Sequence, residues 1–313
     1  MLRMAIPGGS TMTNLAVLVV CLLVGMALRA AKRMPDNAHV AINGFIIQVA
    51  LPALILGHIH GLDLSTALVW PVLMPWILFA LSAALFVVLG RLMAFSDATV
   101  GALIITAGLA NTSFVGLPMI ETFYGPQGIP TGILIDQLGT YLVLSTAGIC
   151  VACYFSSKGV ASRREILMRI VTFPPLVALV LAFVLMPVQY PAWIAGTFQR
   201  LGDTLAPLAL VSVGLQLRLD HLSGNRAALG FGLGFKLVVG PLLIALIYTG
   251  VLSLRGEMTQ VTLFESAMGP QIGGAIVAMQ YGLNPQLITL MVGIGIVLSF
   301  VTLPLWYLAL GAV

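Results

Sequence analysis

The stretch Gly108–Ile120, GLANTSFVGLPMI, interrupts an otherwise apolar part of the chain. It places an Asn-Thr-Ser cluster at residues 111–113 and a proline at Pro118. Proline has no backbone N–H and clashes with the carbonyl group four residues earlier, so it cannot continue a regular helix. A second stretch, MGPQIGG at residues 268–274, interrupts a later apolar segment in a similar way. The two stretches predict two broken helices.

The composition indicates whether these helices fold in water or in a membrane. The 313-residue chain is 60% hydrophobic and 8% charged, with a formal net charge of +4, whereas soluble domains have about 25% charged residues. We therefore expect an all-α polytopic membrane protein. The basic residues fall in short loops between apolar runs, which indicates topology and not a nucleic-acid-binding surface. The chain contains no HExxH, Walker or nucleophile-elbow motif, so neither an enzyme nor a cofactor is expected.

Ten apolar runs have about the 20-residue length of a membrane-crossing helix. They are residues 13–31, 40–60, 66–90, 98–124, 129–154, 171–188, 192–217, 227–253, 258–282 and 285–310. Ten basic residues lie in one set of alternate connections: Arg29, Lys32, Arg33, Arg91, Lys158, Arg163, Arg164, Arg169, Arg218 and Arg226. The other set holds Arg3 and Arg255. This bias predicts a cytoplasmic first set and two non-cytoplasmic termini in the inner (plasma) membrane.

The basic connection at residues 156–170 divides the spans into two sets of five. It separates a first repeat, 1–155, from a second, 171–313. Because five is odd, the second repeat must enter the membrane in the opposite orientation. The repeats are weakly similar, for example ETFYGPQGIP (121–130) and AMQYGLNPQL (278–287). Both interruptions fall in the fourth span of a repeat, and such matched breaks in inverted halves indicate a transporter's binding site.

Each break predicts a helix N-terminus at membrane depth. Its free N–H groups and positive dipole form a site for an anion, and broken backbone survives there only where it is buried or lines a cavity. We expect the helices to restart after Pro118 and Pro270, with Gly116 and Gly269 supplying backbone freedom. The predicted substrate-binding residues are Asn111, Thr112, Ser113, Gly116, Pro118, Gly269, Pro270 and Gln271. The alternative is a pair of simple proline kinks packed by small residues.

Four stretches carry a resemblance to a known family. They are NTSFVGLP (111–118), DTLAPLALVSVGLQL (203–217), FKLVVGPLLIA (235–245) and ESAMGPQIGGAIVAMQYGLNPQL (265–287). They resemble the auxin efflux carrier family, which includes the plant PIN carriers and many bacterial permeases. The resemblance implies two inverted five-helix repeats, related to the fold of the bile-acid sodium symporters, in which the broken helices 4 and 9 cross beside the substrate.

The resemblance also implies that the helices form two domains with different functions. Spans 1, 2, 6 and 7 resemble a scaffold domain, which usually forms a homodimer, and spans 3–5 and 8–10 resemble a moving transport domain. Asn111 matches the asparagine that binds the substrate carboxylate in the family, while Pro118 and Pro270 match the prolines of the crossing. Glu265 departs from the plant pattern, which has an uncharged polar residue there.

Ionisable residues inside membrane spans are costly and are functional by default. The candidates for coupling or gating are Glu265, Asp136, Gln137, Glu121 and Lys236. Glu265 is expected to hold a proton or, with Gln271, a Na⁺ ion, or else to bind freed backbone N–H groups; no other metal site is expected. Lys236 is expected to attract anions or to pair with Asp136 or Glu265.

The sequence thus predicts a carrier that exports small organic acid anions, such as auxin-like monocarboxylates or malonate- and malate-type acids. The transport domain would move like an elevator. Export needs no coupling ion, because an anion leaving a negative interior gains about 2.3 kcal/mol per 100 mV. The alternatives are uptake coupled to Na⁺ or H⁺ and a non-transporting sensor or channel.

Overall fold

The computed structural model describes residues 9–59, 66–156, 164, 167–168, 171–216, 225–311 and 313. This part of the chain is helical, and an isolated antiparallel bridge between Ala110 and Pro270 is its sole β-type pairing. Of the basic residues used to predict topology, five lie outside the described residues: Arg3, Lys158, Arg163, Arg169 and Arg218.

The helices follow the predicted apolar runs. In the first half they are α1 (Gly9–Ala30), α2 (Ala38–Phe45), α3 (Leu51–His58), α4 (Val69–Leu92), α5 (Asp97–Gly108), α6 (Leu117–Tyr124), α7 (Ile129–Leu134), α8 (Tyr141–Val143) and α9 (Ile149–Tyr154). In the second half they are α11 (Pro174–Val184), α12 (Ala192–Gly202), α13 (Leu205–Gln216), α14 (Arg226–Gly234), α15 (Gly240–Ala245), α16 (Glu257–Ser266), α17 (Ile272–Gln280) and α18 (Pro285–Leu310). Several join end to end through π-helical turns.

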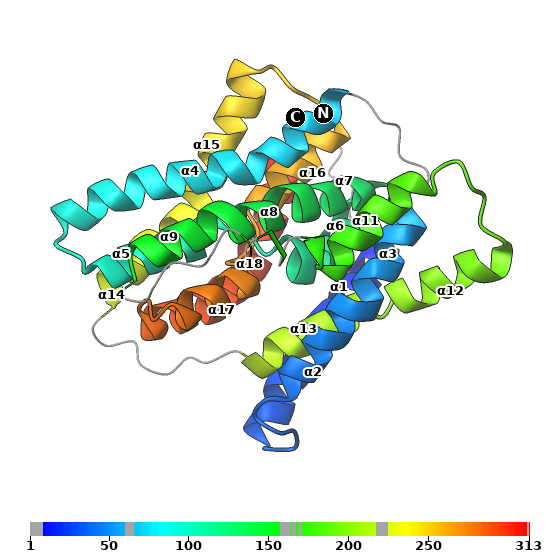
Figure 1. The fold of residues 1–313 in the computed structure, drawn as a ribbon, viewed down its shortest axis with the longest axis horizontal. Coiled ribbons are helices and arrows are strands. Elements are labelled where there is room, and N and C mark those ends of the chain that lie inside the picture. Colours follow the sequence, from blue (N-terminus) through cyan, green and yellow to red (C-terminus); the bar gives the residue numbers. More distant parts are fainter. Residues whose placement is uncertain are drawn as a thin grey trace.

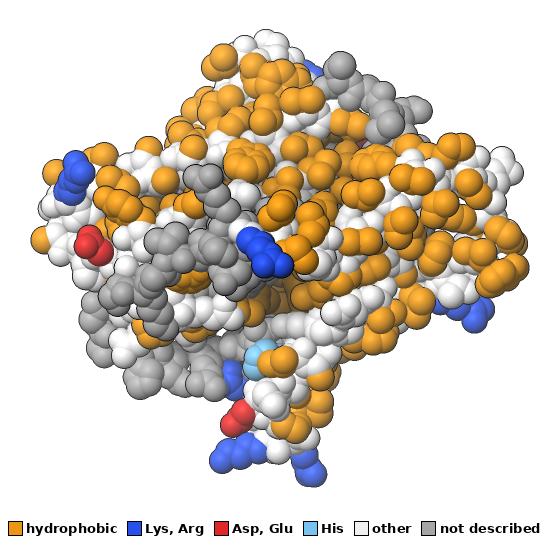
Figure 2. Space-filling view, in the orientation of Figure 1, with side chains coloured by type: hydrophobic (Ala, Val, Ile, Leu, Met, Phe, Trp, Pro, Cys, Tyr) orange, Lys and Arg blue, Asp and Glu red, His pale blue; other side chains and the backbone are white. Residues whose placement is uncertain are grey.

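Five continuous helical stretches are long and apolar enough to cross a membrane. They are Ala38–His58, Val69–Leu92, Pro126–Tyr154, Arg226–Val251 and Pro285–Leu310. Shorter apolar helices, such as Asp97–Gly108 and Pro174–Val184, account for further predicted spans. Hydrophobic side chains cover most of the visible surface, and the few charged ones lie mainly near its margins (Figure 2). The molecule has the surface of a multi-pass membrane protein.

Three π-helical turns have a common cause. The turns Ile46–Ala50, Thr112–Gly116 and Phe235–Val239 each lead directly into a helix whose second residue is proline. These prolines are Pro52, Pro118 and Pro241. A proline ring clashes with the carbonyl group four residues earlier and supplies no N–H to it. An inserted residue widens the helix at that point, and such π-bulges are frequent at functional sites.

The helices form two packed groups (Figure 1). In the first, α13 packs along α1 and α2, and α3 packs against α11 and α12. In the second, α4 packs against α5 and α16, and α18 packs against α5, α14, α16 and α17. The groups meet where α13 contacts the turn Thr112–Gly116 and α1 contacts α6. That meeting point is next to the interrupted helices.

Alternate connections gather at opposite ends of the second group. At one end, Asn284 Nδ2 donates a hydrogen bond to Asn225 Oδ1 (3.0 Å), and the Ser156 hydroxyl donates to the Tyr281 carbonyl. At the other end, the Tyr248 hydroxyl donates to the Trp70 carbonyl (2.6 Å). Connections that are separated in the sequence therefore meet at each end of this group.

Candidate functional site

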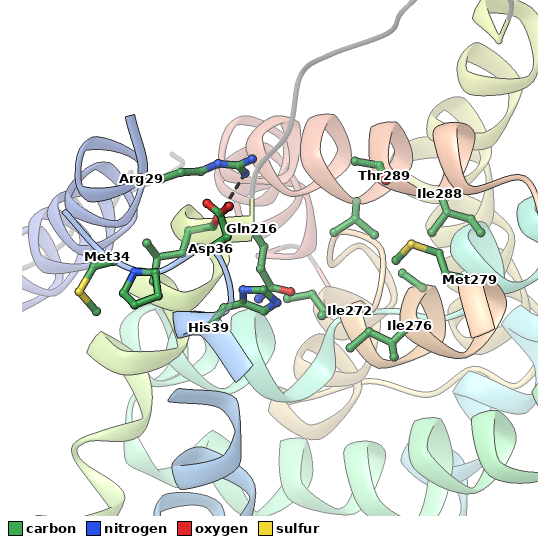
Figure 3. Close-up of a pocket in the computed structure, with 14 residues that line it drawn as sticks. Arg29, Met34, Asp36, His39, Gln216, Ile272, Ile276, Met279, Ile288 and Thr289 are labelled. Atoms are coloured by element: carbon green, nitrogen blue, oxygen red, sulfur yellow. Dashed lines mark hydrogen bonds between the residues drawn. The ribbon is translucent and has the colours of Figure 1, made fainter. Parts of the chain in front are cut away.

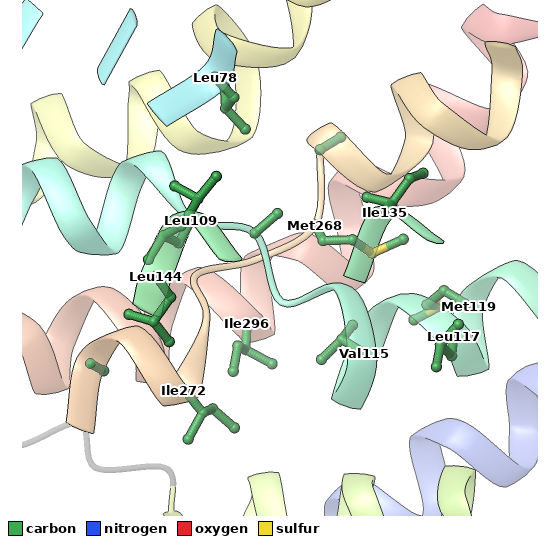
Figure 4. Close-up of a cluster of buried hydrophobic side chains, with 14 of the residues drawn as sticks. Leu78, Leu109, Val115, Leu117, Met119, Ile135, Leu144, Met268, Ile272 and Ile296 are labelled. Atoms are coloured by element: carbon green, nitrogen blue, oxygen red, sulfur yellow. The ribbon is translucent and has the colours of Figure 1, made fainter. Parts of the chain in front are cut away.

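The two interrupted helices cross, and their unwound segments pair with each other. Helix α5 ends at Gly108 and α16 ends at Ser266. The Asn111 N–H donates to the Gly269 carbonyl (2.8 Å), and the Gln271 N–H donates to the Leu109 carbonyl (3.1 Å). Figure 4 shows the two extended segments passing over each other among buried apolar side chains. We call residues 109–111 and 269–271 the helix crossing.

This pairing explains how broken backbone is tolerated inside an apolar core. An unsatisfied N–H or C=O group costs several kcal/mol in a membrane, roughly as much as a lost hydrogen bond in hydrocarbon. The two hydrogen bonds of the crossing satisfy groups that each helix alone leaves free. The two interruptions therefore depend on each other, and neither is a simple proline kink.

The prediction of where the first helix restarts was wrong. The break lies at Leu109–Asn111, and the π-helical turn Thr112–Gly116 then runs into α6, where Pro118 is the second residue. The helix is continuous through Pro118, because the preceding π-helical turn accommodates the proline ring and its missing N–H. In the second helix the restart follows Pro270 as predicted, since α17 begins at Ile272.

The expected role of Gly116 was also wrong. Gly116 has helical dihedral angles (φ −60°, ψ −58°), so it needs no special backbone freedom. A Cβ atom on Gly116 would lie 2.5 Å from Glu265 Oε1, and one on Gly269 would lie 3.0 Å from the Ile296 Cα. Both glycines allow close packing around the crossing.

Thr112 and Ser113 turn toward Asp136, which is buried in the π-helical turn Ile135–Thr140. The Thr112 hydroxyl donates to Asp136 Oδ1 (2.5 Å) and Gln137 Nε2 donates to Oδ2 (2.6 Å). Ser113 provides a further hydrogen bond to this carboxyl group. Thr112 and Ser113, predicted to bind substrate, therefore stabilise a buried carboxylate in this conformation.

Asn111 and Gln271 lie on the two strands of the crossing. Asn111 is 1% exposed, and its Nδ2 lies 3.5 Å from the Pro270 carbonyl, at the limit of a hydrogen bond. Gln271 precedes α17 and is 9% exposed, and its Oε1 is buried without a hydrogen-bond partner. The two amide side chains thus flank the helix starts at Thr112 and Ile272.

Glu265 is fully buried one turn before the second break. Neither of its carboxylate oxygens has a hydrogen-bond partner, so it does not bind the freed backbone N–H groups. It lies against Gly116, and the charges of Asp136 and Lys236 act on it. Two further buried oxygens of the same region, Gln137 Oε1 and Thr140 Oγ1, also lack partners. The sequence analysis did not single out Thr140, because an isolated threonine in an apolar run carries no signal.

Pairing with Asp136 or Glu265 was one of two expectations for Lys236; it forms no hydrogen bond with either acid, although the charge of Glu265 acts on it. Its Nζ donates to the carbonyl of Ser266 (3.0 Å), the last residue of α16. The side chain is fully buried. A helix C-terminus carries a partial negative charge and unsatisfied carbonyls, and a lysine there supplies both a donor and a positive charge. Lys236 thus caps the broken end of α16.

Glu121 is not part of this group of residues. It lines a separate small cavity. Pro118 of the same helix also lines this cavity, and His58 and Asp203, at the ends of α3 and α12, line it from the other group of helices. The structure therefore brings together Asn111, Gln271, Asp136, Gln137, Glu265 and Lys236, and it separates Glu121 from them.

Comparisons with known proteins agree with this architecture. A family model described as "Membrane transport protein" matches the chain twice, over residues 10–161 and 156–307. A transporter described as uncharacterized, from Methanothermobacter thermautotrophicus, is 31% identical over 305 residues, which cover 96% of this chain and 99% of that protein. A second such transporter, from Methanocaldococcus jannaschii, is 25% identical over 93% of this chain and 96% of its own length.

Auxin efflux carrier component 1 of Arabidopsis thaliana is similar over a shorter region. It is 28% identical over 127 residues, which cover 40% of this chain and 20% of the plant protein. The predicted resemblance to the auxin efflux carriers is confirmed by this match and by the family model. The chain therefore belongs to the membrane transport protein family that is related to the auxin efflux carriers.

Proposed function

We propose that this protein is a carrier that exports small organic acid anions and holds the carboxylate at the helix crossing. The observation that carries the proposal is the pairing of two broken helices with α6 and α17 continuing from it. The N–H groups at the starts of these segments and the amides of Asn111 and Gln271 are suited to bind a carboxylate. The names of the relatives support transport, and those of the plant proteins indicate an organic acid.

The proposed architecture is two inverted repeats of five spans. The double match of the family model supports it. So do Gly125 and Gly282, which follow Tyr124 and Tyr281 at the ends of α6 and α17 and have nearly equal positive φ angles of 78° and 74°. Positive φ is accessible to glycine without strain. A Tyr-Gly pair therefore ends the second half of each broken helix.

The two packed groups of helices correspond to the proposed scaffold and transport domains. The scaffold would contain α1–α3 and α11–α13, and the transport domain would contain the crossing and the buried charges. Asn111 is almost completely buried, so substrate access requires the two groups to move relative to each other. An elevator-like displacement of the transport domain would expose the crossing to each side in turn, and the scaffold would be the part that forms a homodimer.

Glu265 supports a second candidate, which is transport coupled to H⁺ or Na⁺. A buried carboxylate without a hydrogen-bond donor is strongly unfavourable in its charged form. A proton or a Na⁺ ion would remove this penalty, and Gln137 Oε1, Thr140 Oγ1 and Gln271 Oε1 are further buried oxygens without partners. No group of three or more His, Cys, Asp or Glu residues suited to a metal ion occurs among the described residues, so such an ion would depend on neutral oxygens.

Counterflow in proteoliposomes tests the proposal. Vesicles loaded with malonate or indole-3-acetate should exchange the radiolabelled acid, and net efflux should accelerate when the loaded side is made negative. Asn111→Ala should weaken apparent affinity by roughly 1.5–3 kcal/mol, the contribution of a hydrogen bond to a charged group. Replacing Na⁺ with K⁺, or changing pH, separates the uncoupled from the coupled mechanism. Absence of saturable exchange of any carboxylate would refute the proposal.

A further inference from the structure

A cavity of about 280 Å³ lies between the two packed groups of helices. The ends of α1 and α13 and the segment that leads into α2 form one wall, and α17 and α18 form the other. Figure 3 shows Arg29, Asp36, His39 and Gln216 gathered on the first wall, opposite Ile276, Met279 and Ile288. The basic residues Lys32 and Arg33 belong to the same connection as Asp36, so the cavity opens at the end predicted to be cytoplasmic.

The first wall is polar, and hydrogen bonds hold two of its side chains, Arg29 and Gln216. Arg29 is half-buried and donates a hydrogen bond from Nη1 to the Leu215 carbonyl (3.2 Å). Gln216 is held by hydrogen bonds from its Nε2 to Ser212. His39 is half-buried, and its Nδ1 is buried without a hydrogen-bond partner. No protein hydrogen bond therefore fixes this nitrogen, and a small rotation of the ring can direct it toward a ligand.

The second wall is apolar and regular. Ile272, Ile276 and Met279 recur on one face of α17, and Ile288 and Val292 do so on α18. Residues three or four apart share a face of a helix. The wall begins at Ile272, directly after Gln271, so it leads from the mouth of the cavity to the helix crossing. A solute in the cavity therefore contacts cationic and polar groups on one side and hydrocarbon on the other.

We propose that this cavity is a vestibular binding site for amphipathic monocarboxylates, with the carboxylate on Arg29 and His39 and the apolar body against Ile276 and Met279. The site deepens the proposed function, on which it rests, by defining the substrate class. Its volume lies near the lower limit of ligand pockets, about 300 Å³, which suits a small acid. A second carboxylate would lie either against the apolar wall, where burying a charge is costly, or beside Asp36, which repels it, so the site discriminates against dicarboxylates.

Ligand-induced thermal shifts of the purified full-length protein test this site. The probes are hexanoate, adipate (the dicarboxylate of the same chain length) and hexanol. A ligand that binds the folded state raises the melting temperature by mass action. At equal concentrations, hexanoate should raise it more than either of the other probes. Equal shifts with hexanoate and adipate would overturn the proposal, and so would equal shifts with hexanoate and hexanol.

Three substitutions sharpen the test. Arg29→Gln should weaken hexanoate binding by about tenfold or more, as expected for loss of a charge-assisted hydrogen bond. Arg33→Gln is the control, because Arg33 is exposed in the same connection and does not line the cavity. Asp36→Asn should increase adipate binding, a gain that misfolding cannot produce. An unchanged hexanoate affinity in Arg29→Gln, or an unchanged adipate affinity in Asp36→Asn, would overturn the site.

The proposed function and the vestibular site can fail separately. If Asn111→Ala abolishes counterflow while Arg29→Gln leaves hexanoate affinity unchanged, transport at the crossing stands and the vestibular site is refuted. If the wild-type protein exchanges no carboxylate but binds hexanoate in a manner that depends on Arg29, the site stands and the proposed transport is refuted.

Discussion

Lys236 and Glu265 show how differently two buried ionisable residues can be accommodated. The lysine donates to the carbonyl at the end of α16, whereas the carboxylate of Glu265 has no hydrogen-bond partner. Lys236 therefore has a structural contact that its removal would break. Glu265 has no hydrogen bond to lose; the charge of Lys236 acts on it, and under the proposed coupled mechanism a bound proton or Na⁺ ion would offset the cost of burying it. These two residues yield opposite expectations for stability.

Lys236→Met should destabilise the protein. The substitution leaves the Ser266 carbonyl buried and unpaired, which costs about 1–3 kcal/mol, and removes the positive charge at the end of α16. The melting temperature in detergent measures this loss. Lys32→Met is the control, because Lys32 is exposed beyond the end of α1. A melting temperature equal to that of the control would show that the hydrogen bond to Ser266 contributes nothing.

Glu265→Gln should not lower the melting temperature, because a neutral amide is less costly to bury than an unpartnered carboxylate. Asp136→Asn is the matched comparison and should destabilise, since Asp136 accepts hydrogen bonds from Thr112 and Gln137. Under the coupled mechanism, Glu265→Gln should also abolish the response of counterflow to pH or Na⁺. If Glu265→Gln retains the wild-type ion response, Glu265 is not the coupling residue.

At the scale of elements, α1 and α13 approach each other through glycine. A Cβ atom on Gly25 would lie 2.3 Å from the Val211 carbonyl oxygen, and one on Gly214 would lie 2.3 Å from the Leu22 carbonyl oxygen. In both cases the obstacle is backbone, which cannot rotate aside. Small residues at such contacts let membrane helices pack closely, where packing rather than the hydrophobic effect drives association.

Gly25→Ala should therefore separate α1 from α13 and destabilise the protein by about 1–3 kcal/mol, the usual cost of overpacking. Gly234→Ala on α14 is the control: no atom lies within 4 Å of the added methyl group, and alanine favours a helix over glycine by about 1 kcal/mol. Melting temperatures should fall for the first variant and hold or rise for the second. A stable Gly25→Ala protein would contradict the close packing of these helices.

At the scale of the whole molecule, the basic connections and the vestibular cavity share one end. If that end is cytoplasmic, a cysteine placed at Ile276 in a background lacking Cys21, Cys150 and Cys153 should react with a membrane-impermeant maleimide in inside-out vesicles. It should not react in right-side-out vesicles. A cysteine at Glu257, exposed at the opposite end, should give the reverse result. The same pattern for both cysteines would refute the predicted orientation.

The sequence predicted the helical class, the apolar spans and the two interruptions, because these depend on local composition and on the covalent limits of proline. It also indicated Asn111, Gln271, Asp136, Glu265 and Lys236, because charged and amide side chains are rare in apolar runs. Two features were predicted incorrectly: the position of the first helix break and the role of Gly116. The first break ends at Asn111, seven residues before Pro118, since a π-helical turn accommodates the proline. Gly116 has ordinary helical dihedral angles and lies against the carboxyl group of Glu265.

Residue types and spacing determined that this chain enters a membrane as helices and that two of the helices break. Tertiary structure alone decided the partners: residues 109–111 pair with 269–271, Lys236 caps α16, and the Thr112 hydroxyl binds Asp136. Each of these contacts joins residues 24 to about 160 positions apart. Hydrogen-bond partners over such distances follow from how the helices pack, and a local pattern contains no information about that packing.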